Sequence, residues 1–184
     1  MILVVAATER EFAGASGADT LCCGIGPVEA GVATAVALSR AQPRALLHVG
    51  IAGAPTLSPR AVVVGSEAIY CDLVDPASIL PRVDRTRPAP ALVEAARRAV
   101  PDAVTTPIAT SARVGGSSSA LVEAMEGFAV LRAAELARVP AVEVRTISNR
   151  PTDVDRSTWR IEDALDRLRE ILPPLIGEVS ACVH

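Results

Sequence analysis

Short apolar runs alternate with Ala-rich or amphipathic stretches along the chain, and the two kinds of stretch predict two kinds of element. We expect strands at residues 2–6, 21–23, 45–49, 62–64, 67–71, 103–109 and 142–148. We expect helices at residues 27–41, 90–100, 125–138 and 157–172. Strands that alternate with helices in this way predict an α/β fold with a central sheet.

The predicted elements show no internal repeat and no linker that would mark a domain boundary. A chain of 184 residues is long enough to bury most of its apolar surface in one core. We therefore expect residues 1–184 to form a single domain. The Pro- and Arg-rich stretch at residues 75–90 reads as a loop and is a candidate for a mobile cover.

Composition narrows the possible partners. Apolar residues make up 50% of the chain and aromatic residues only 2%, so the core has to be built from Ala, Val, Leu and Ile. All 18 basic residues are Arg, and the absence of Lys excludes a Schiff-base or P-loop lysine. A formal charge of −3 without a basic cluster argues against binding to nucleic acid. A small molecule is the expected partner.

The chain carries no membrane or secretion signal that we recognise. No stretch approaches the ~20 apolar residues that a membrane-spanning helix needs. The apolar run at the start is too short for a signal sequence and leads directly into Glu9 and Glu11. We therefore expect no membrane contact and a location in the cytoplasm.

Cysteine and histidine are too sparse for a disulfide framework or a metal site. The four cysteines form no C-x-x-C pair, and the two histidines are His48, inside an apolar run, and His184. Cys22 and Cys23 are adjacent in a predicted strand, so we expect two small core residues that point to opposite faces. We expect His48 to be a core histidine whose polar atoms are satisfied, and we expect no metal.

Carboxylates at strand ends remain as candidates for chemistry. Gly24-Ile-Gly26 is followed by Glu29 where a dinucleotide-binding fingerprint needs its third glycine, and no G-x-S-x-G nucleophile elbow occurs. Glu11 follows the first strand and is either a general base or a solvated acid near a helix N-terminus. Glu126 is either a ligand for vicinal hydroxyls or an acid in the first turn of a helix.

Four segments taken together resemble the nucleoside phosphorylase and nucleosidase superfamily. They are Met1–Glu11, Gly50-Ile-Ala-Gly53, Val122–Phe128 and Val144–Asn149. Within it, Ala6-Ala-Thr-Glu9, Glu123-Ala-Met-Glu-Gly-Phe128 and Asp155-Arg-Ser-Thr-Trp-Arg-Ile161 look most like the futalosine hydrolase family. The resemblance implies a three-layer α/β/α domain with a central mixed, largely parallel sheet.

The resemblance also implies roles for individual residues. Glu11 would activate the water that attacks the anomeric carbon of a ribose. Glu126 would bind the ribose hydroxyls while Met125 packs against the sugar, and Asn149, after Ser148, would bind the leaving purine. The backbone and side chains of Ile51, Ala52 and Gly53 would lie against the substrate, since glycines let the backbone approach closely. The resemblance implies no cofactor.

The function implied is hydrolysis of the N-ribosidic bond of futalosine, which releases hypoxanthine in menaquinone biosynthesis. Hydrolysis is favoured over phosphorolysis because residues 6–9 lack the glycines that hold phosphate and because Glu11 would repel it. One alternative is a methylthioadenosine/S-adenosylhomocysteine nucleosidase, in which an aspartate rather than Asn149 delivers a proton to the purine. An α/β protein without a nucleoside role is a further alternative.

The segment between Ala109 and Glu123 is shorter than in the superfamily, which has a loop and a full helix there. Residues 115–119 read as a flexible linker, so a helix is expected to be missing. This departure leaves open a degenerate, non-catalytic nucleoside-binding or oligomerisation module. Because the superfamily often completes its pocket across a dimer interface, we expect a homodimer.

Overall fold

The computed structural model describes residues 1–74, 77, 79–115, 122–153 and 155–183. The strands are β1 (Ile2–Ala6), β2 (Asp19–Cys22), β3 (Ala45–Gly53), β4 (Val62–Tyr70), β5 (Arg85–Thr86), β6 (Val104–Thr110), β7 (Glu123–Ala124) and β8 (Ala141–Asn149). The helices are α1 (Pro27–Arg40), α2 (Pro90–Ala99), α3 (Gly127–Leu136) and α4 (Ile161–Cys182), with short 3₁₀ turns η1 (Glu9–Phe12) and η2 (Arg156–Thr158).

The strands form one mixed sheet in which parallel pairings dominate. β1 lies between β2 and β3, and all three run parallel. β8 is parallel to β3 on one side and antiparallel to β4 on the other. β4 is parallel to β6, β6 is parallel to β7, and β7 returns to β3 at the pair Gly53 and Glu123. The sheet therefore closes on itself through β7, which brings residue 123 beside the end of β3.

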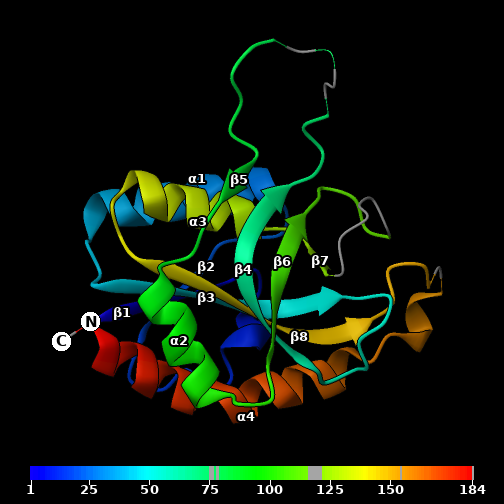
Figure 1. Ribbon diagram of the computed structural model, residues 1–184. Coiled ribbons are helices and arrows are strands. Elements are labelled where there is room, and N and C mark those ends of the chain that lie inside the picture. The colour runs from blue at the N-terminus through cyan, green and yellow to red at the C-terminus, as the bar shows by residue number, and fades with distance from the viewer. Residues whose placement is uncertain (75–76, 78, 116–121, 154, 184) are drawn as a thin grey trace.

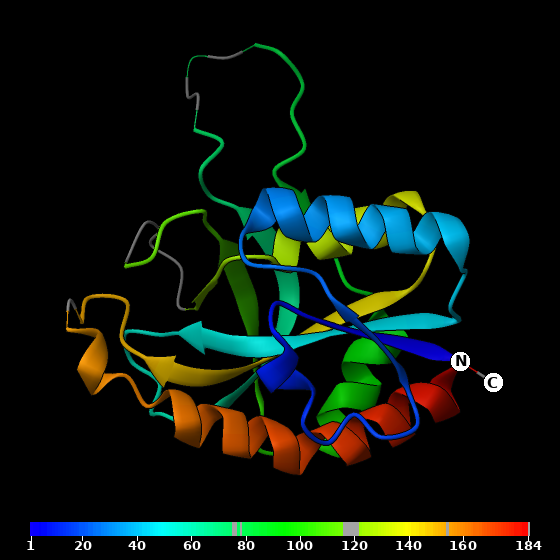
Figure 2. The same ribbon diagram turned by 180° about the vertical axis from the view of Figure 1, so that it is seen from behind.

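Helices cover both faces of the sheet, as Figures 1 and 2 show. α1 and α3 lie side by side on one face, and α2 and α4 lie on the other. Aliphatic side chains fill both interfaces between helices and sheet. α1 and α3 contribute Leu38, Val130 and Leu131, and α2 and α4 contribute Leu92, Leu168 and Leu172. Full burial of each such side chain contributes roughly 1.5–3 kcal/mol. The predicted three-layer α/β/α fold with a mixed, largely parallel sheet is confirmed.

Several predicted strand bounds were wrong because glycines do not stop these strands. β3 continues from residue 49 through Gly50 to Gly53, paired with β8 along this length. The predicted strands at 62–64 and 67–71 are one strand, β4, which shifts register against β6 between Gly65 and Ala68. Gly65 allows the irregularity, since an added Cβ there would lie 3.3 Å from Ile108.

The bounds of two helices also differ from the prediction. α3 begins at Gly127 rather than residue 125, and it ends at Leu136 because Arg138 takes a left-handed conformation with φ of 59°. α4 begins at Ile161 rather than residue 157, since residues 156–158 form η2, and it continues past residue 172 to Cys182, through Pro173 and Pro174. The prolines lie on the exposed face, whereas Leu175 and Val179 beyond them are fully buried. Burial of these side chains outweighs the lost backbone hydrogen bonds.

The stretch at 75–90 is only partly a loop. Residues 85–86 pair with β4 as β5, and α2 starts at Pro90. Residues 75, 76 and 78 lie outside the described part of the chain. The described remainder of the connection projects beyond the layer of α1 and α3 (Figure 1). Among the described residues, no helix is both long and apolar enough to cross a membrane.

Candidate active site

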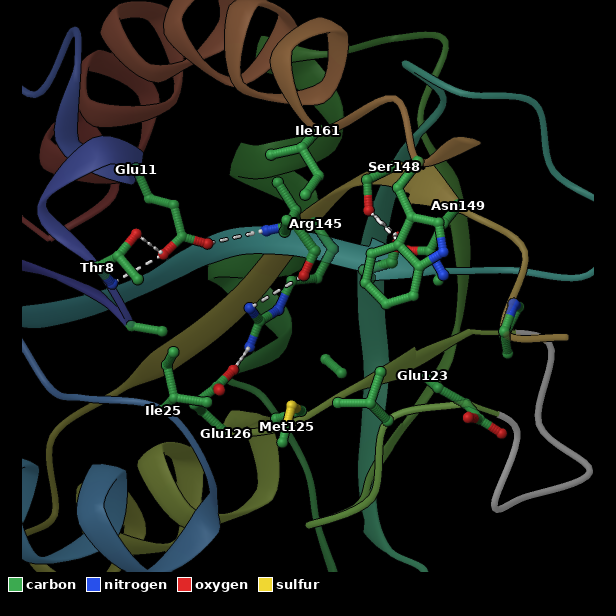
Figure 3. A pocket seen from close by; sticks show the side chains of 18 of the residues that line it. Thr8, Glu11, Ile25, Glu123, Met125, Glu126, Arg145, Ser148, Asn149 and Ile161 are labelled. Atoms are coloured by element: carbon green, nitrogen blue, oxygen red, sulfur yellow. Dashed lines mark hydrogen bonds and ion pairs between the residues drawn. The ribbon is translucent and has the colours of Figure 1, made fainter. Parts of the chain in front are cut away.

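A cavity of about 410 Å³ lies beyond the ends of β1, β3 and β8, next to η1, β7 and the start of α4. The cavity thus lies outside the carboxyl ends of the parallel strands, as ligand sites commonly do in α/β folds. Every residue predicted for the site lines the cavity: Glu11, Ile51, Ala52, Gly53, Met125, Glu126, Ser148 and Asn149. In Figure 3, Arg145 lies between Glu11 and Glu126, and Ser148 and Asn149 lie together on the opposite side.

Glu11 is buried and held in one orientation, which is the opposite of a solvated surface acid. Its Oε2 accepts hydrogen bonds of 2.9 Å from both the backbone N and the Oγ1 of Thr8, and its Oε1 accepts one of 3.1 Å from Ile51 N. The side chain is only 5% exposed. Gly50 makes this packing possible, because a Cβ there would lie 2.7 Å from Glu11 Oε1. The carboxylate is therefore oriented before any substrate binds.

Glu126 is also buried, and both of its oxygens have partners. β7 delivers the chain to this position, and Glu126 is the N-cap residue of α3. Its Oε1 accepts a hydrogen bond of 3.1 Å from Gly26 N, and its Oε2 forms an ion pair of 3.3 Å with Arg145 Nη2. A carboxylate offers about four lone-pair positions, so it can still accept from a ligand in the cavity.

Arg145 stands at the centre of the site and was not among the predicted site residues. It is 1% exposed, its Nε donates to Glu143 Oε1 at 2.8 Å, and its Nη1 lies 3.5 Å from Ile51 O. Burial lowers the pKa of Arg145, but the carboxylates of Glu143 and Glu126 more than offset this and raise it. The guanidinium is therefore charged. The side chain of Arg145 has room because the residue paired with it on β3 is Gly50, which has no side chain.

His48 is a core residue as predicted, but it also belongs to this cluster. It is fully buried, its Nδ1 lies 3.0 Å from Val5 O, and its Nε2 contacts Arg145 Nη2. Because Nδ1 donates to the carbonyl, Nε2 is free to accept from the guanidinium. Burial, and then the charge of Arg145, lower the pKa of His48 well below 6.5. The imidazole is therefore neutral.

The amide of Asn149 has an orientation fixed by its neighbours at the end of β8. Its Oδ1 accepts from Ser148 Oγ at 2.8 Å, and its Nδ2 donates to Arg150 O at 3.1 Å. Ser148 Oγ also lies 3.2 Å from Ala52 O. Gly53 keeps the space open, since a Cβ there would approach Asn149 Nδ2 to 3.1 Å. An amide N–H donor is thus held beside the cavity.

The rest of the wall combines apolar side chains with arginines. The apolar residues outside the predicted set are Ala7, Ile25, Val114, Ala124, Pro151, Trp159, Ile161 and Leu165. The arginines other than Arg145 are Arg10, Arg113 and Arg156, and Arg156 packs 5.6 Å from the centre of the Trp159 ring. The predicted linker at 115–119 is described only at Gly115, and residues 116–121 lie outside the described chain. The described part of 75–90 contributes nothing to the wall.

The cysteines do not supply a nucleophile here. Cys23 is buried and Cys22 is exposed, so the predicted opposite orientation is correct, but the prediction that Cys22 is a core residue was wrong. Burial, followed by the charge of Glu126, raises the pKa of Cys23 to about 12, which keeps it a thiol. Within the described residues, no group of three or more His, Cys, Asp or Glu side chains could hold a metal ion.

The sequence of the chain as a whole identifies its family. The sequence profile of the phosphorylase superfamily matches residues 20–177, which is most of the chain. The chain belongs to the phosphorylase superfamily. Futalosine hydrolase of Streptomyces coelicolor is 36% identical over 186 aligned positions, covering 86% of this chain and 78% of the relative. This relative agrees with the resemblance found in the short motifs.

Two solved structures share the fold of this chain. A 5′-methylthioadenosine/S-adenosylhomocysteine nucleosidase from Colwellia psychrerythraea, solved with adenine, superposes with a TM-score of 0.84 at 23% identity, covering 97% of this chain and 95% of that one. A futalosine hydrolase mutant of Helicobacter pylori superposes with a TM-score of 0.84 at 17% identity, covering 96% and 98%. At these identities, the two structures show a shared fold and no more.

Proposed function

We propose that this protein hydrolyses the N-ribosidic bond of futalosine and releases hypoxanthine. The observation that carries the proposal is the convergence of Glu11, Glu126 and Asn149 on one cavity, from three separate segments of the chain. The 36% identity to a futalosine hydrolase supports the choice of substrate. Four free cysteines fit a reducing compartment, so we propose that the reaction takes place in the cytoplasm.

In the proposed mechanism, Glu11 takes a proton from the attacking water. Its two oxygens already accept three hydrogen bonds, which hold the carboxylate at a fixed angle to the cavity. A general base positioned in this way contributes a factor of about 10²–10⁴ to the rate. The proton moves from water to the Glu11 carboxylate as the water oxygen bonds to the anomeric carbon, and the electrons of the N-ribosidic bond leave with the purine. The purine anion then takes up a proton from solvent to become hypoxanthine, and Glu11 returns its proton to solvent.

Glu126 has the second role, because it can accept hydrogen bonds from the ribose hydroxyls while Met125 packs against the sugar. Cleavage of a glycosidic bond passes through a transition state in which the sugar becomes positively charged. The negative charge of Glu126 is nearly buried, so it acts on this developing charge with little screening from water.

Asn149 would bind the leaving purine. The held Nδ2 can donate to a ring nitrogen such as N7, which stabilises the negative charge left on the base. An amide cannot deliver a proton, which weighs against a methylthioadenosine-type nucleosidase, the second enzymatic candidate. That candidate retains support from the fold shared with the nucleosidase from Colwellia psychrerythraea.

A homodimer is also part of the proposal. Val28, Val32 and Val36 form an exposed apolar stripe on α1, being 77%, 59% and 43% exposed, and Ile25 at the cavity wall continues it. A second copy of the chain seated on this stripe would cover both the stripe and the edge of the cavity. Light scattering should give the mass of a dimer for the protein and of a monomer for Val32→Asp. A monomeric mass for the unaltered protein would contradict the proposal.

Release of free base tests the catalytic proposal. Purified protein is incubated separately with futalosine, inosine and methylthioadenosine, next to a Glu11→Gln variant, and the bases are separated by chromatography. We expect hypoxanthine from futalosine, with a rate reduced by about 10²–10⁴ in the variant. Adenine from methylthioadenosine would favour the second enzymatic candidate. Binding of nucleosides without release of any base would instead support a non-catalytic binding module.

A further inference from the structure

Glu143 is a charged residue that the proposed mechanism leaves without a task. It lies in the middle of β8 with no exposed surface, and it does not line the cavity. Its Oε1 accepts the hydrogen bond from Arg145 Nε at 2.8 Å, and no described residue is a hydrogen-bond partner of its Oε2. The described hydrogen bond of Glu143 therefore joins it to the cavity through Arg145, which does line the cavity.

The surrounding backbone is shaped to admit this carboxylate. Gly127, the first residue of α3, lies against it, and a Cβ at that position would be 2.5 Å from Glu143 Cδ and still nearer to both oxygens. The carboxylate thus faces the N-terminal end of α3, where the helix dipole favours negative charge. On the other side, His48 is the register partner of Glu143 and is neutral. Glycine at position 127 therefore leaves room for the Glu143 carboxylate.

The charges of the site explain why a second carboxylate is useful. Arg145 lies beside a ribose that becomes positively charged, and its own charge opposes that change. Glu11 also acts on the guanidinium, but it loses its charge as it takes the proton from water. With Glu126 as the one remaining charged partner, the two charges would cancel and leave little negative charge for the sugar. Glu143 pairs with the guanidinium from behind, at 2.8 Å compared with 3.3 Å for Glu126. The group of Glu126, Arg145 and Glu143 then carries a net negative charge.

We propose that Glu143 is a positioning residue that neutralises Arg145 from behind and fixes the plane of its guanidinium, so that Glu126 keeps its negative charge for the ribose. The inference rests on the proposed function, since it assigns Glu143 a part in the stabilisation of a cationic ribose. Burial raises the pKa of Glu143, the guanidinium of Arg145 acts against that rise, and the charge of Glu126 adds to it, so the charge of Glu143 depends on its contact with Arg145.

The test uses Glu143→Gln, which keeps the size of the side chain and an oxygen for Arg145 Nε but removes the charge. We expect kcat for futalosine to fall by about 10–100-fold with KM changed by less than about 3-fold, because removal of a preorganised electrostatic contact acts mainly on the transition state. Glu178→Gln is the matched control, because it removes an exposed carboxylate on α4 that pairs with Arg98, and should leave both constants unchanged.

Ligand affinity separates an electrostatic role from a structural one. The probes are 9-deazainosine, which has a neutral ribose, and the same base joined to a protonated iminoribitol. We expect Glu143→Gln to weaken the cationic ligand by about the same factor as kcat, while the affinity for 9-deazainosine stays within about 3-fold of the unaltered protein. Equal loss of both affinities in a folded variant, or an unchanged kcat, would overturn the proposal.

Glu143→Asp covers the case in which the glutamine variant does not fold. It keeps a carboxylate but lengthens the contact with Arg145 on which the charge of Glu143 depends, so the preference for the cationic ligand should fall by less than the factor expected for glutamine. Equal weakening of both ligands in the folded aspartate variant would refute the role of the charge. Hydrolysis of futalosine by the unaltered protein tests the proposed function separately. If the unaltered protein hydrolyses nothing, the two ligand affinities can still be measured, so failure of the proposed function and failure of this inference remain distinguishable.

Discussion

Replacement of Gly127 by alanine tests the tight packing beneath the site. Gly127 is the first residue of α3, and helix propensity alone predicts that alanine there stabilises the protein by up to about 1 kcal/mol. The structure predicts the opposite. The new Cβ would lie 2.5 Å from Glu143 Cδ, and Cβ contacts shorter than 3.0 Å are essentially absent from real proteins.

The size of the expected effect follows from what has to move. Glu143 is fully buried and bonded to Arg145, so neither side chain can swing into solvent to make room. Insertion of a methyl group into a packed core costs about 1–3 kcal/mol, and disturbance of the buried ion pair adds to this. We therefore expect Gly127→Ala to lower the free energy of unfolding by at least about 1 kcal/mol.

Urea unfolding followed by circular dichroism, at one fixed protein concentration, measures this change. Gly177→Ala is the matched control, because Gly177 lies in α4 and a Cβ there would meet nothing within 4 Å. The control should be stabilised by about 0.5–1 kcal/mol. If Gly127→Ala were stabilised to the same extent as the control, the described packing of Glu143 against α3 would be refuted.

Two further variants probe the base end and the buried histidine. Asn149→Asp puts an oxygen where Nδ2 now donates to Arg150 O, so hypoxanthine release from futalosine should fall by about tenfold or more; an unchanged kcat/KM would contradict the role of the amide. The pKa of His48 is lowered in the folded protein, so below pH 6.5 the folded protein binds fewer protons than the unfolded protein does. The free energy of unfolding should therefore fall on acidification, by at most about 1.4 kcal/mol per pH unit. In His48→Asn this contribution is absent, and the stability difference between the two proteins in urea unfolding should shrink from pH 7.5 to 5.5. A constant difference would show that His48 does not titrate as described.

Much of the fold could be predicted because its elements carry local signals. β1 and the start of α1 lie at their predicted places, since an apolar run and a proline at the first helical turn act over a few residues. The extension of α4 past Pro173 was missed because local rules end a helix at a proline. The burial of Leu175 and Val179, which decides the matter, depends on a sheet that is distant in sequence.

The candidate site was predictable in part for the same reason. Glu11, Glu126 and Asn149 stand in short segments that resemble a known superfamily, and all three line the cavity. Arg145 and Glu143 were missed, although two charges spaced by two residues within an apolar strand must point to the same face. That spacing could have marked them as a buried pair.

The sequence by itself determined the kinds of element, the aliphatic core and the residue types available for chemistry, because these depend on composition and on contacts between near neighbours. Only the tertiary structure decided the charge arrangement of the site. His48 and Glu143 face each other across β3 and β8, and Arg145 passes over Gly50 to reach Glu126 at the start of α3. Such pairings depend on strand register and helix packing, which join residues far apart in the chain, and electrostatic interactions gain strength only where that packing excludes water.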